Sequence, residues 1–158
     1  MASGISVAPV TEARLRYIAA HFRPEERLEC LASWNEAPME ALRRSWADSR
    51  EAWAFLAPCG TPLCVAGITD GQDGEGWWYP WMLGTTDVLG QRIAFLRACR
   101  VYLPRVLSVY GKLRTFIDAR YDLSLKWAKW LGFEVRAPAP FGMGCALFCE
   151  VRLEWAAR

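Results

Sequence analysis

Three glutamates near the start of the chain are the first candidates for proton-transfer chemistry. Glu25, Glu26 and Glu29 lie in a segment with helical character, and Glu25 and Glu29 share one helical face. A carboxylate held near a bound substrate can act as a general base. The alternative, which we favour, is a solvated first helical turn whose acids pair with Arg23 and Arg27.

The histidine and the cysteines predict no further catalytic site. His21, the only histidine, falls at the end of the first expected helix, where an imidazole interacts with the helix dipole. No serine lies in a nucleophile-elbow motif, so a Ser-His-Asp set is not supported. The pairs Cys59/Cys64 and Cys145/Cys149 have x4 and x3 spacings, unlike the x2 spacing of common zinc sites. We therefore expect no metal site and reduced, mostly buried thiols.

The composition indicates one globular domain over residues 1–158. Hydrophobic residues make up 53% and charged residues 23%, which excludes a disordered chain. A net charge of +2 gives no indication of nucleic-acid binding. With no signal peptide and no apolar run near the ~20 residues that span a bilayer, we expect a cytoplasmic protein. Nine tryptophans cannot all be fully buried, which favours a subunit or partner interface.

The segment from Leu113 to Val135 is expected to organise the fold. An apolar run typical of a strand is followed by Asp122, which we predict to be a helix N-cap. The predicted helix ends at Gly132, a residue that can adopt the left-handed conformation at C′. Its apolar face is predicted to consist of Leu123, Trp127, Trp130 and Leu131.

The rest of the chain predicts a mixed sheet with helices. The expected order is a strand near residues 5–10, helices beginning at Thr11, Pro24 and Pro38, strands at 52–57, 63–69 and 77–83, a long helix ending at Gly111, the central segment, and a last strand at 145–153. Pro80 requires its strand to be at an edge, bulged or splayed from a neighbour. Pro104 should kink or break the long helix.

The residues Trp130-Leu131-Gly132-Phe133 resemble the end of the last conserved motif of the GCN5-related N-acetyltransferases, the GNAT superfamily. The order of predicted elements is also similar to that of this superfamily. The resemblance implies an α+β fold with α/β/α layers. It also implies a mostly antiparallel mixed sheet of six to seven strands, a central splay, and about four flanking helices.

Three stretches resemble, in more detail, a phage-encoded GNAT-like family: 23–29, 82–87 and 118–133. Members of that family are described as acetyltransferases or as internal virion proteins. The resemblance implies a protein of the host cytoplasm that could enter the virion. Its partners would be other virion proteins or further copies of itself, with neither nucleic acid nor membrane indicated.

The resemblance also implies where acetyl-CoA would bind, if it binds. In GNAT enzymes the pattern Gln/Arg-x-x-Gly-x-Gly/Ala, at the start of the long helix, holds the pyrophosphate with backbone N–H groups. That pattern is absent here, and Asp87 adds a negative charge; the favoured interpretation is that Thr86 or Asp87 simply caps the helix. The implied cofactor-binding residues are Leu83, Gly84, Thr85, Gly90, Gln91 and Arg92.

Two functions remain open. The family's catalytic Tyr falls on Ala128 and its Asn on Tyr121, which favours a virion component with little or no catalysis and no required cofactor. The alternative is an active acetyl-CoA-dependent N-acetyltransferase acting on an amine of a protein or small molecule, with Glu25, Glu29 and Tyr121 as candidate catalytic residues. Pro80 suits a splay that admits the pantetheine arm. Tryptophans filling that splay would exclude the arm.

Overall fold

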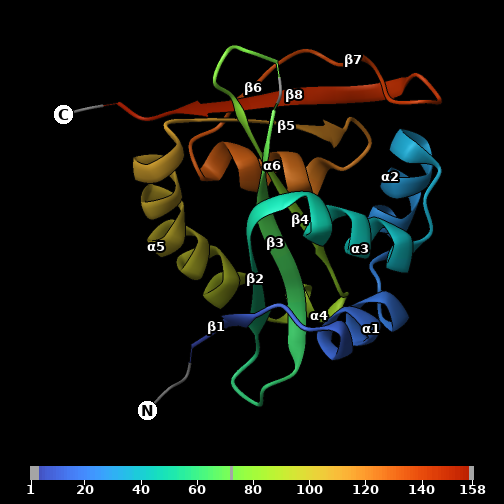
Figure 1. Ribbon diagram of the computed structural model, residues 1–158, viewed down its shortest axis with the longest axis vertical. Helices are drawn as coiled ribbons and strands as arrows, with labels where there is room; N and C mark the ends of the chain where they lie inside the picture. Colours follow the sequence, from blue (N-terminus) through green and yellow to red (C-terminus); the bar gives the residue numbers. More distant parts are fainter. Residues whose placement is uncertain (1–3, 72, 157–158) are drawn as a thin grey trace.

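The computed structural model describes residues 4–71 and 73–156, and the elements within them follow the predicted order (Figure 1). These elements are β1 (Ser6–Pro9), α1 (Glu12–Ala20), α2 (Pro24–Trp34), α3 (Pro38–Asp48), β2 (Ser49–Leu56), β3 (Pro62–Asp70), β4 (Trp78–Gly84), α4 (Asp87–Gly90), α5 (Arg92–Tyr110), β5 (Lys112–Asp118), α6 (Asp122–Trp130), β6 (Glu134–Val135), β7 (Ala139–Phe141) and β8 (Ala146–Glu154). The strands and helices beyond the expected numbers are short: α4 has four residues, β6 two and β7 three.

The strands form one mixed sheet in the order β1-β2-β3-β4-β5-β8-β6, with β7 also pairing with β8. The β4–β5 pair is parallel and the other pairs are antiparallel. Only Trp78 and Leu113 are partners between β4 and β5, so the two strands separate beyond this point. The predicted α+β fold with a splayed sheet is therefore confirmed.

Pro80 lies on β4, in the part that has separated from β5. Thr85 N donates to Leu63 O of β3 at 2.8 Å, and successive peptide groups of a strand face opposite neighbours. Gly84 and Pro80 therefore direct their backbone groups toward the gap. Because no strand partner lies there, the missing N–H of Pro80 costs the sheet nothing, and the predicted splay at this residue is confirmed.

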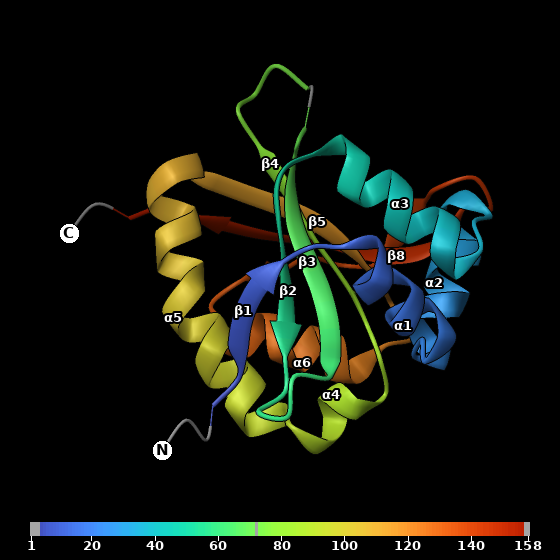
Figure 2. The ribbon, with the colours of Figure 1, turned by 60° about the horizontal axis from the view of Figure 1, so that its bottom comes forward.

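The helices cover opposite faces of the sheet, as Figure 2 shows for α1–α3 and α5. On one face, Leu15, Ile18 and Leu42 pack with Val65 of β3 and with β2. On the other face, the core contains the buried side chains Phe55, Leu63, Cys64, Val88, Phe95 and Trp127, contributed by β2, β3, α4, α5 and α6. Alternating side chains of β2 and β3 supply both cores, as expected for strands buried on both faces.

Local signals at the helix ends were largely correct. The Thr11 side chain accepts a hydrogen bond from Arg14 N at 3.2 Å, which confirms it as an N-cap. Gly111 and Gly132 follow α5 and α6 with φ of 80° and 101°, as their predicted roles require. The prediction for Asp122 is wrong by one position: Tyr121 is the N-cap of α6, without a side-chain cap bond, and Asp122 is the first helical residue.

The remaining differences concern helices α4, α5 and α6. Thr86 is the predicted N-cap, but it caps the single turn α4, and its side chain makes no cap hydrogen bond. Helix α5 continues through Pro104 without a break. On α6 only Trp127 of the predicted apolar face is buried, whereas Leu123 and Trp130 are exposed. The guanidinium of Arg100 covers the Trp130 ring at 3.6 Å, so an aromatic–cation contact replaces core packing there.

Candidate functional site

A cavity of about 890 Å³ occupies the gap between β4 and β5 and extends to both faces of the sheet. From one side it is lined by α2 and α3, and from the other by α5 and α6. Trp53, Trp81 and Trp127 contribute to its walls but leave this volume free. The tryptophans therefore do not fill the splay, and the cavity can admit a ligand through the sheet.

At the open end of the gap, two carboxylates of α2 bind the separated strands. Glu26 Oε2 accepts a hydrogen bond from Gly84 N at the end of β4. One turn later, Glu29 Oε2 accepts a hydrogen bond from Asp118 N at the end of β5, at 3.3 Å. Helix α2 thus satisfies backbone donors that a continuous sheet would have satisfied by pairing.

The corner between α1 and α2 places these carboxylates. Phe22 forms an isolated bridge with Thr85, and Arg23 N donates to Gly84 O at 3.0 Å. Pro24 then starts α2 in the position that proline favours. The Arg23 side chain is only 5% exposed and lies 3.7 Å from Glu26 and 3.8 Å from Glu25. The predicted pairing of these acids with Arg23 is confirmed, but the predicted solvation is wrong for Arg23, which is buried, and for Glu26, which is largely buried.

Burial changes the protonation of the two deeper glutamates. It raises the pKa of Glu26 to about 8, although the Gly84 N–H and Arg23 oppose the rise. It also raises the pKa of Glu29 to about 7, against the opposing effect of the Asp118 N–H. A carboxylate with a pKa close to neutrality can both take up and release a proton under physiological conditions. Glu29 therefore has the protonation behaviour expected of a general base.

Tyr121 lines the same cavity from the start of α6. Its hydroxyl is buried and has no hydrogen-bond partner among the described residues. Burial, followed by the nearby Asp118 carboxylate, raises the pKa of Tyr121 to about 12, so the hydroxyl keeps its proton. Asp118 itself is anchored by Arg120, whose Nε and terminal nitrogen donate to it at 3.0 and 2.7 Å.

Five aromatic side chains line the same cavity as Glu29; we call them the aromatic wall. They are Trp34 of α2, Tyr79 of β4, Phe116 of β5, Phe141 of β7 and Phe148 of β8. The rings of Phe116 and Phe141 stack with centroids 4.1 Å apart, and Trp34 contacts Phe141 edge-on at 6.0 Å. Tyr79 contacts Phe116, and Phe148 contacts Phe141, at 6.4 and 5.2 Å.

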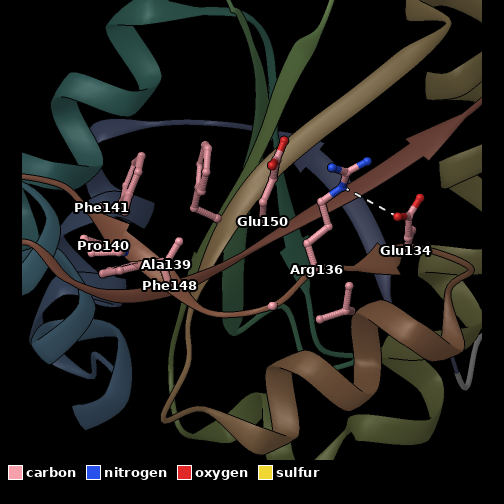
Figure 3. Close-up of a pocket in the computed structure, with 10 residues that line it drawn as sticks. Glu134, Arg136, Ala139, Pro140, Phe141, Phe148 and Glu150 are labelled. Atoms are coloured by element: carbon pink, nitrogen blue, oxygen red, sulfur yellow. Dashed lines mark ion pairs between the residues drawn. The ribbon is translucent and has the colours of Figure 1, made fainter.

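A second pocket, of about 550 Å³, adjoins the aromatic wall where β6 and β7 pair with β8 (Figure 3). It shares Phe116, Phe141 and Phe148 with the main cavity. Its opposite side carries the Glu134–Arg136 ion pair at 3.5 Å, which is exposed to solvent. These three rings therefore line both the main cavity and a smaller pocket.

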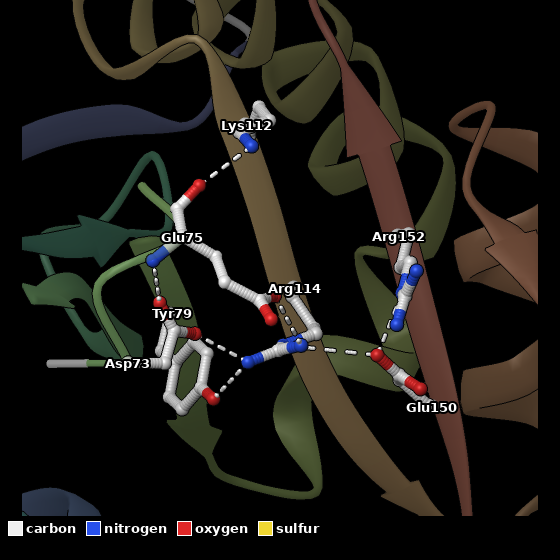
Figure 4. A network of polar contacts seen from close by, with 7 residues as sticks. All are labelled: Asp73, Glu75, Tyr79, Lys112, Arg114, Glu150 and Arg152. Carbon is white, nitrogen blue, oxygen red and sulfur yellow. Dashed lines mark hydrogen bonds and ion pairs between the residues drawn. The ribbon is translucent and has the colours of Figure 1, made fainter. Parts of the chain in front are cut away.

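At the opposite end of the gap, Arg114 holds β4 and β5 together (Figure 4). Its guanidinium pairs with Asp73, donates to Tyr79 Oη at 2.8 Å and lies 3.7 Å from Glu150. Arg152 donates to the same Glu150 at 2.6 Å. These contacts join β4, β5, β8 and the β3–β4 connection next to the single Trp78–Leu113 pair, so this end of the gap is closed.

The predicted catalytic residues are partly brought together. Glu29 and Tyr121 both line the cavity, and the Glu29 carboxylate is one of the groups that raise the pKa of Tyr121. Glu25 also lines the cavity but is largely exposed and pairs with Arg23. Glu26 has a more direct structural role than the sequence indicated. Glu26 differs from its neighbours because it binds Gly84 N, and this contact joins parts of the chain that are far apart in sequence.

The implied cofactor-binding residues divide into two groups. Leu83 lines the cavity, while Gly84 and Thr85 are buried, and the Thr85 hydroxyl donates to Leu63 O at 3.0 Å. Gly90, Gln91 and Arg92 lie at the junction of α4 and α5, away from the cavity lining. The aromatic wall was not predicted, because its rings come from elements that are far apart in sequence. Within β5, the pattern indicates only that Arg114, Phe116 and Asp118 share one face of the strand.

Two further predictions concern the cysteines and membranes. All six cysteines are free; Cys30, Cys64 and Cys149 are buried, whereas Cys59 and Cys145 are exposed. Within residues 4–71 and 73–156, no group of three His, Cys, Asp or Glu side chains could hold a metal ion. In that same part of the chain, no helix combines the length and apolar character needed to cross a membrane.

No protein-family model matches the sequence, and no curated protein matches it. Solved structures do match its fold. A GCN5-related N-acetyltransferase from Kribbella flavida is 15% identical, with a TM-score of 0.69, over 96% of this chain and 98% of that chain. An N-acetyltransferase from Staphylococcus aureus is 14% identical, with a TM-score of 0.70, over 96% and 99% of the two chains.

A structure from Salmonella typhimurium, solved with its cofactor acetyl-CoA, is 15% identical with a TM-score of 0.67 over 99% of this chain and 96% of that chain. These similarities extend over nearly the whole length of both partners, although the identities are low. The chain therefore has the fold of the GCN5-related N-acetyltransferases.

Proposed function

We propose that the protein is an N-acyltransferase that uses acetyl-CoA and acts on an amine bound in the cavity. The observation that carries the proposal is the open cavity of about 890 Å³ between β4 and β5, which Glu29 and Tyr121 both line. A cavity through a sheet can receive two reactants from opposite faces, and holding them in register removes much of the entropic barrier to their reaction.

The residues present fit one part of acetyl-CoA better than the other. The gap beyond the Trp78–Leu113 pair leaves room for a narrow arm, and Ala128 lines it with a small side chain. The phosphate end has less support, because α4 fills the connection to α5 and Asp87 begins that turn. Arg92 at the start of α5 is the cation available for phosphate there. Acetyl-CoA would supply an activated thioester carbonyl.

The chain's own contribution is the movement of protons. Glu29 Oε2 is held by Asp118 N, and Oε1 has no donor among the described residues, so this carboxylate can take a proton from the ammonium of the acceptor. The Tyr121 hydroxyl keeps its proton and can donate a hydrogen bond that stabilises the departing thiolate, which then takes its proton from solvent.

The test is calorimetry with acetyl-CoA together with detection of free thiol in the presence of a panel of primary amines. We expect micromolar binding and thiol release that depends on the amine. Glu29→Gln should lower kcat/KM by a factor of about 100 while acetyl-CoA affinity changes less than twofold, because the base does not bind the thioester. Glu134→Gln, an exposed carboxylate of the second pocket, is the control. Absence of binding at millimolar acetyl-CoA would refute the proposal.

A second candidate is a phage virion component with little or no catalysis. It is favoured by the Glu26–Gly84 contact. The N–H of Gly84 faces the gap and is already bound by a carboxylate of the chain, so it is not free to bind a ligand. It is also favoured by four exposed tryptophans, Trp34, Trp46, Trp130 and Trp155, which suit contacts with other proteins or with further copies of this chain. On this proposal the protein is made in the host cytoplasm and packaged.

Mass spectrometry of purified phage particles, combined with the acetyl-CoA titration, distinguishes the two candidates. A virion component should be found in the particles at a constant copy number and show no acetyl-CoA binding. Binding without presence in the particles would favour the enzyme.

A further inference from the structure

The aromatic wall and Glu29 meet at one place in the cavity. Phe116 precedes Asp118 by two residues on β5, so both side chains face the same side of the sheet about 7 Å apart. Asp118 N binds Glu29, and Trp34 lies on the same helix as Glu29. Phe116 and Trp34 therefore line the cavity close to the point where Glu29 binds β5, so one ligand can reach both a ring and this carboxylate.

The charges around this volume favour a cation. Glu25, Glu26 and Glu29 line it. Arg23 is already paired with two of these three glutamates, and Arg120, the other cation that acts on Glu29, is held by Asp118. Arg44 also lines the cavity, but its guanidinium pairs with Glu36 at 2.5 Å and with Asp48 at 3.8 Å. An ammonium group placed at Glu29 would therefore meet one carboxylate with a free oxygen and the faces of neighbouring rings, which attract cations.

The position of the aromatic wall is determined by a close backbone contact. Gly142 has a φ of 78°, and a Cβ on it would lie 2.6 Å from Ser33 O. Met143 N also donates to Ser33 O at 2.8 Å. The β7–β8 turn is thus pressed against the end of α2, which places Phe141 between Trp34 and Phe116.

We propose that the cavity binds a primary amine carried on an aromatic group, with the ring against Phe116 and Phe141 and the ammonium at Glu29. That this ligand is the acyl acceptor rests on the proposed function. A polyamine or a free lysine would satisfy Glu29 but leave the aromatic wall in contact with water. An aromatic carboxylate would cover the wall but could not form an ammonium–carboxylate pair with Glu29.

Calorimetry without acetyl-CoA tests this assignment directly. The probes are 2-phenylethylamine, n-butylamine as the cation without a ring, and 3-phenylpropionate as the ring with the opposite charge. We expect 2-phenylethylamine to bind at least tenfold more tightly than either control. Equal affinity for n-butylamine, or tighter binding of 3-phenylpropionate, would overturn the proposal.

Variants then test separately the contact of the ligand's ring with Phe116 and the contact of its ammonium group with Glu29. Phe116→Leu should weaken binding of 2-phenylethylamine at least fivefold and leave n-butylamine unchanged, whereas Glu29→Gln should weaken both amines at least tenfold. Glu134→Gln is the matched control and should bind like the unmodified protein. Circular dichroism melting shows that each variant is folded. If Glu29→Gln is unfolded, Phe116→Leu alone decides, and unchanged affinity in that variant contradicts the assignment.

The outcomes separate this inference from the proposed function. Binding of 2-phenylethylamine without any acetyl transfer would leave the aromatic-amine site standing and refute the transferase. Acetyl transfer to spermidine or lysine but not to 2-phenylethylamine would support the transferase and refute the aromatic-amine site.

Discussion

The two ends of the β4–β5 gap are bridged by different kinds of side chain. At the closed end, the permanently charged Arg114 joins the strands through Asp73, Tyr79 and Glu150. At the open end, α2 reaches across with Glu26 and Glu29, whose pKa values burial has raised into the range where they titrate. The closed end should therefore hold the sheet at any ordinary pH, whereas the open end should respond to protons and to ligands.

The largest effect should follow from breaking the closed end. Arg114→Met removes the cation from a side chain that is 13% exposed and leaves its acidic partners without their charge partner. We expect a loss of about 3 kcal/mol in the free energy of unfolding, measured by urea denaturation. Arg136→Met, at an exposed pair, is the control and should change the stability by less than about 0.5 kcal/mol. A similar small effect in both variants would show that the closed end does not depend on Arg114.

The open end should give the protein a stability that decreases with rising pH. The pKa values of Glu26 and Glu29, about 8 and about 7, lie above the ordinary value of 4.5, so the folded state binds more protons than the unfolded state between these values. The stabilisation is fully present below pH 4.5 and is lost as the pH rises through 7 and 8.

We expect a loss of about 2 kcal/mol between pH 5 and pH 8, less than the full shifts imply because the cavity admits water. Urea denaturation across this range measures it, and Glu26→Gln should flatten the curve. A stability that rises with pH in the unmodified protein would mean that these carboxylates are ionised in the folded state.

A smaller effect is expected where the aromatic wall joins α2. Gly142→Ala should lower the free energy of unfolding by about 1.5 kcal/mol, because a side chain at positive φ is strained and its Cβ meets Ser33 O. Gly60→Ala is the matched control, since Gly60 has a φ of 88° but nothing within 4 Å of its Cβ position. Thermal unfolding of both variants measures the two losses of stability. The difference between them is the effect of the contact with Ser33, because the strain of positive φ is common to both. Equal losses would show that the contact with Ser33 relaxes freely.

The smallest effect is expected at Pro80, inside the gap. Pro80→Ala adds an N–H that points to the cavity, where no β5 acceptor lies, and we expect a change in the free energy of unfolding below about 0.5 kcal/mol. Hydrogen exchange at the new amide should be fast. Slow exchange with a gain above 1 kcal/mol would show that β5 can pair with β4 there, and that the gap is narrower than the structure indicates.

Local signals predicted most of the elements because they act over a few residues. Thr11 could be recognised as a cap and Gly132 as a stop, because their effects depend on adjacent backbone groups. Pro80 indicated an edge, a bulge or a splay for the same reason, and the resemblance to the acetyltransferases favoured the splay. The exposure of Trp130 could not be predicted, because its partner Arg100 lies on another helix and decides that the ring stays at the surface.

The sequence by itself determined the order of elements, the irregularity at Pro80 and the absence of the usual phosphate-binding pattern, since each of these depends on neighbouring residues. The tertiary structure alone decided that Glu26 and Glu29 bind Gly84 and Asp118, and that Phe116 and Phe141 stack beside them. These contacts join parts of the chain far apart in sequence. Their energies depend on burial and on distances in space, which no local pattern of residues contains.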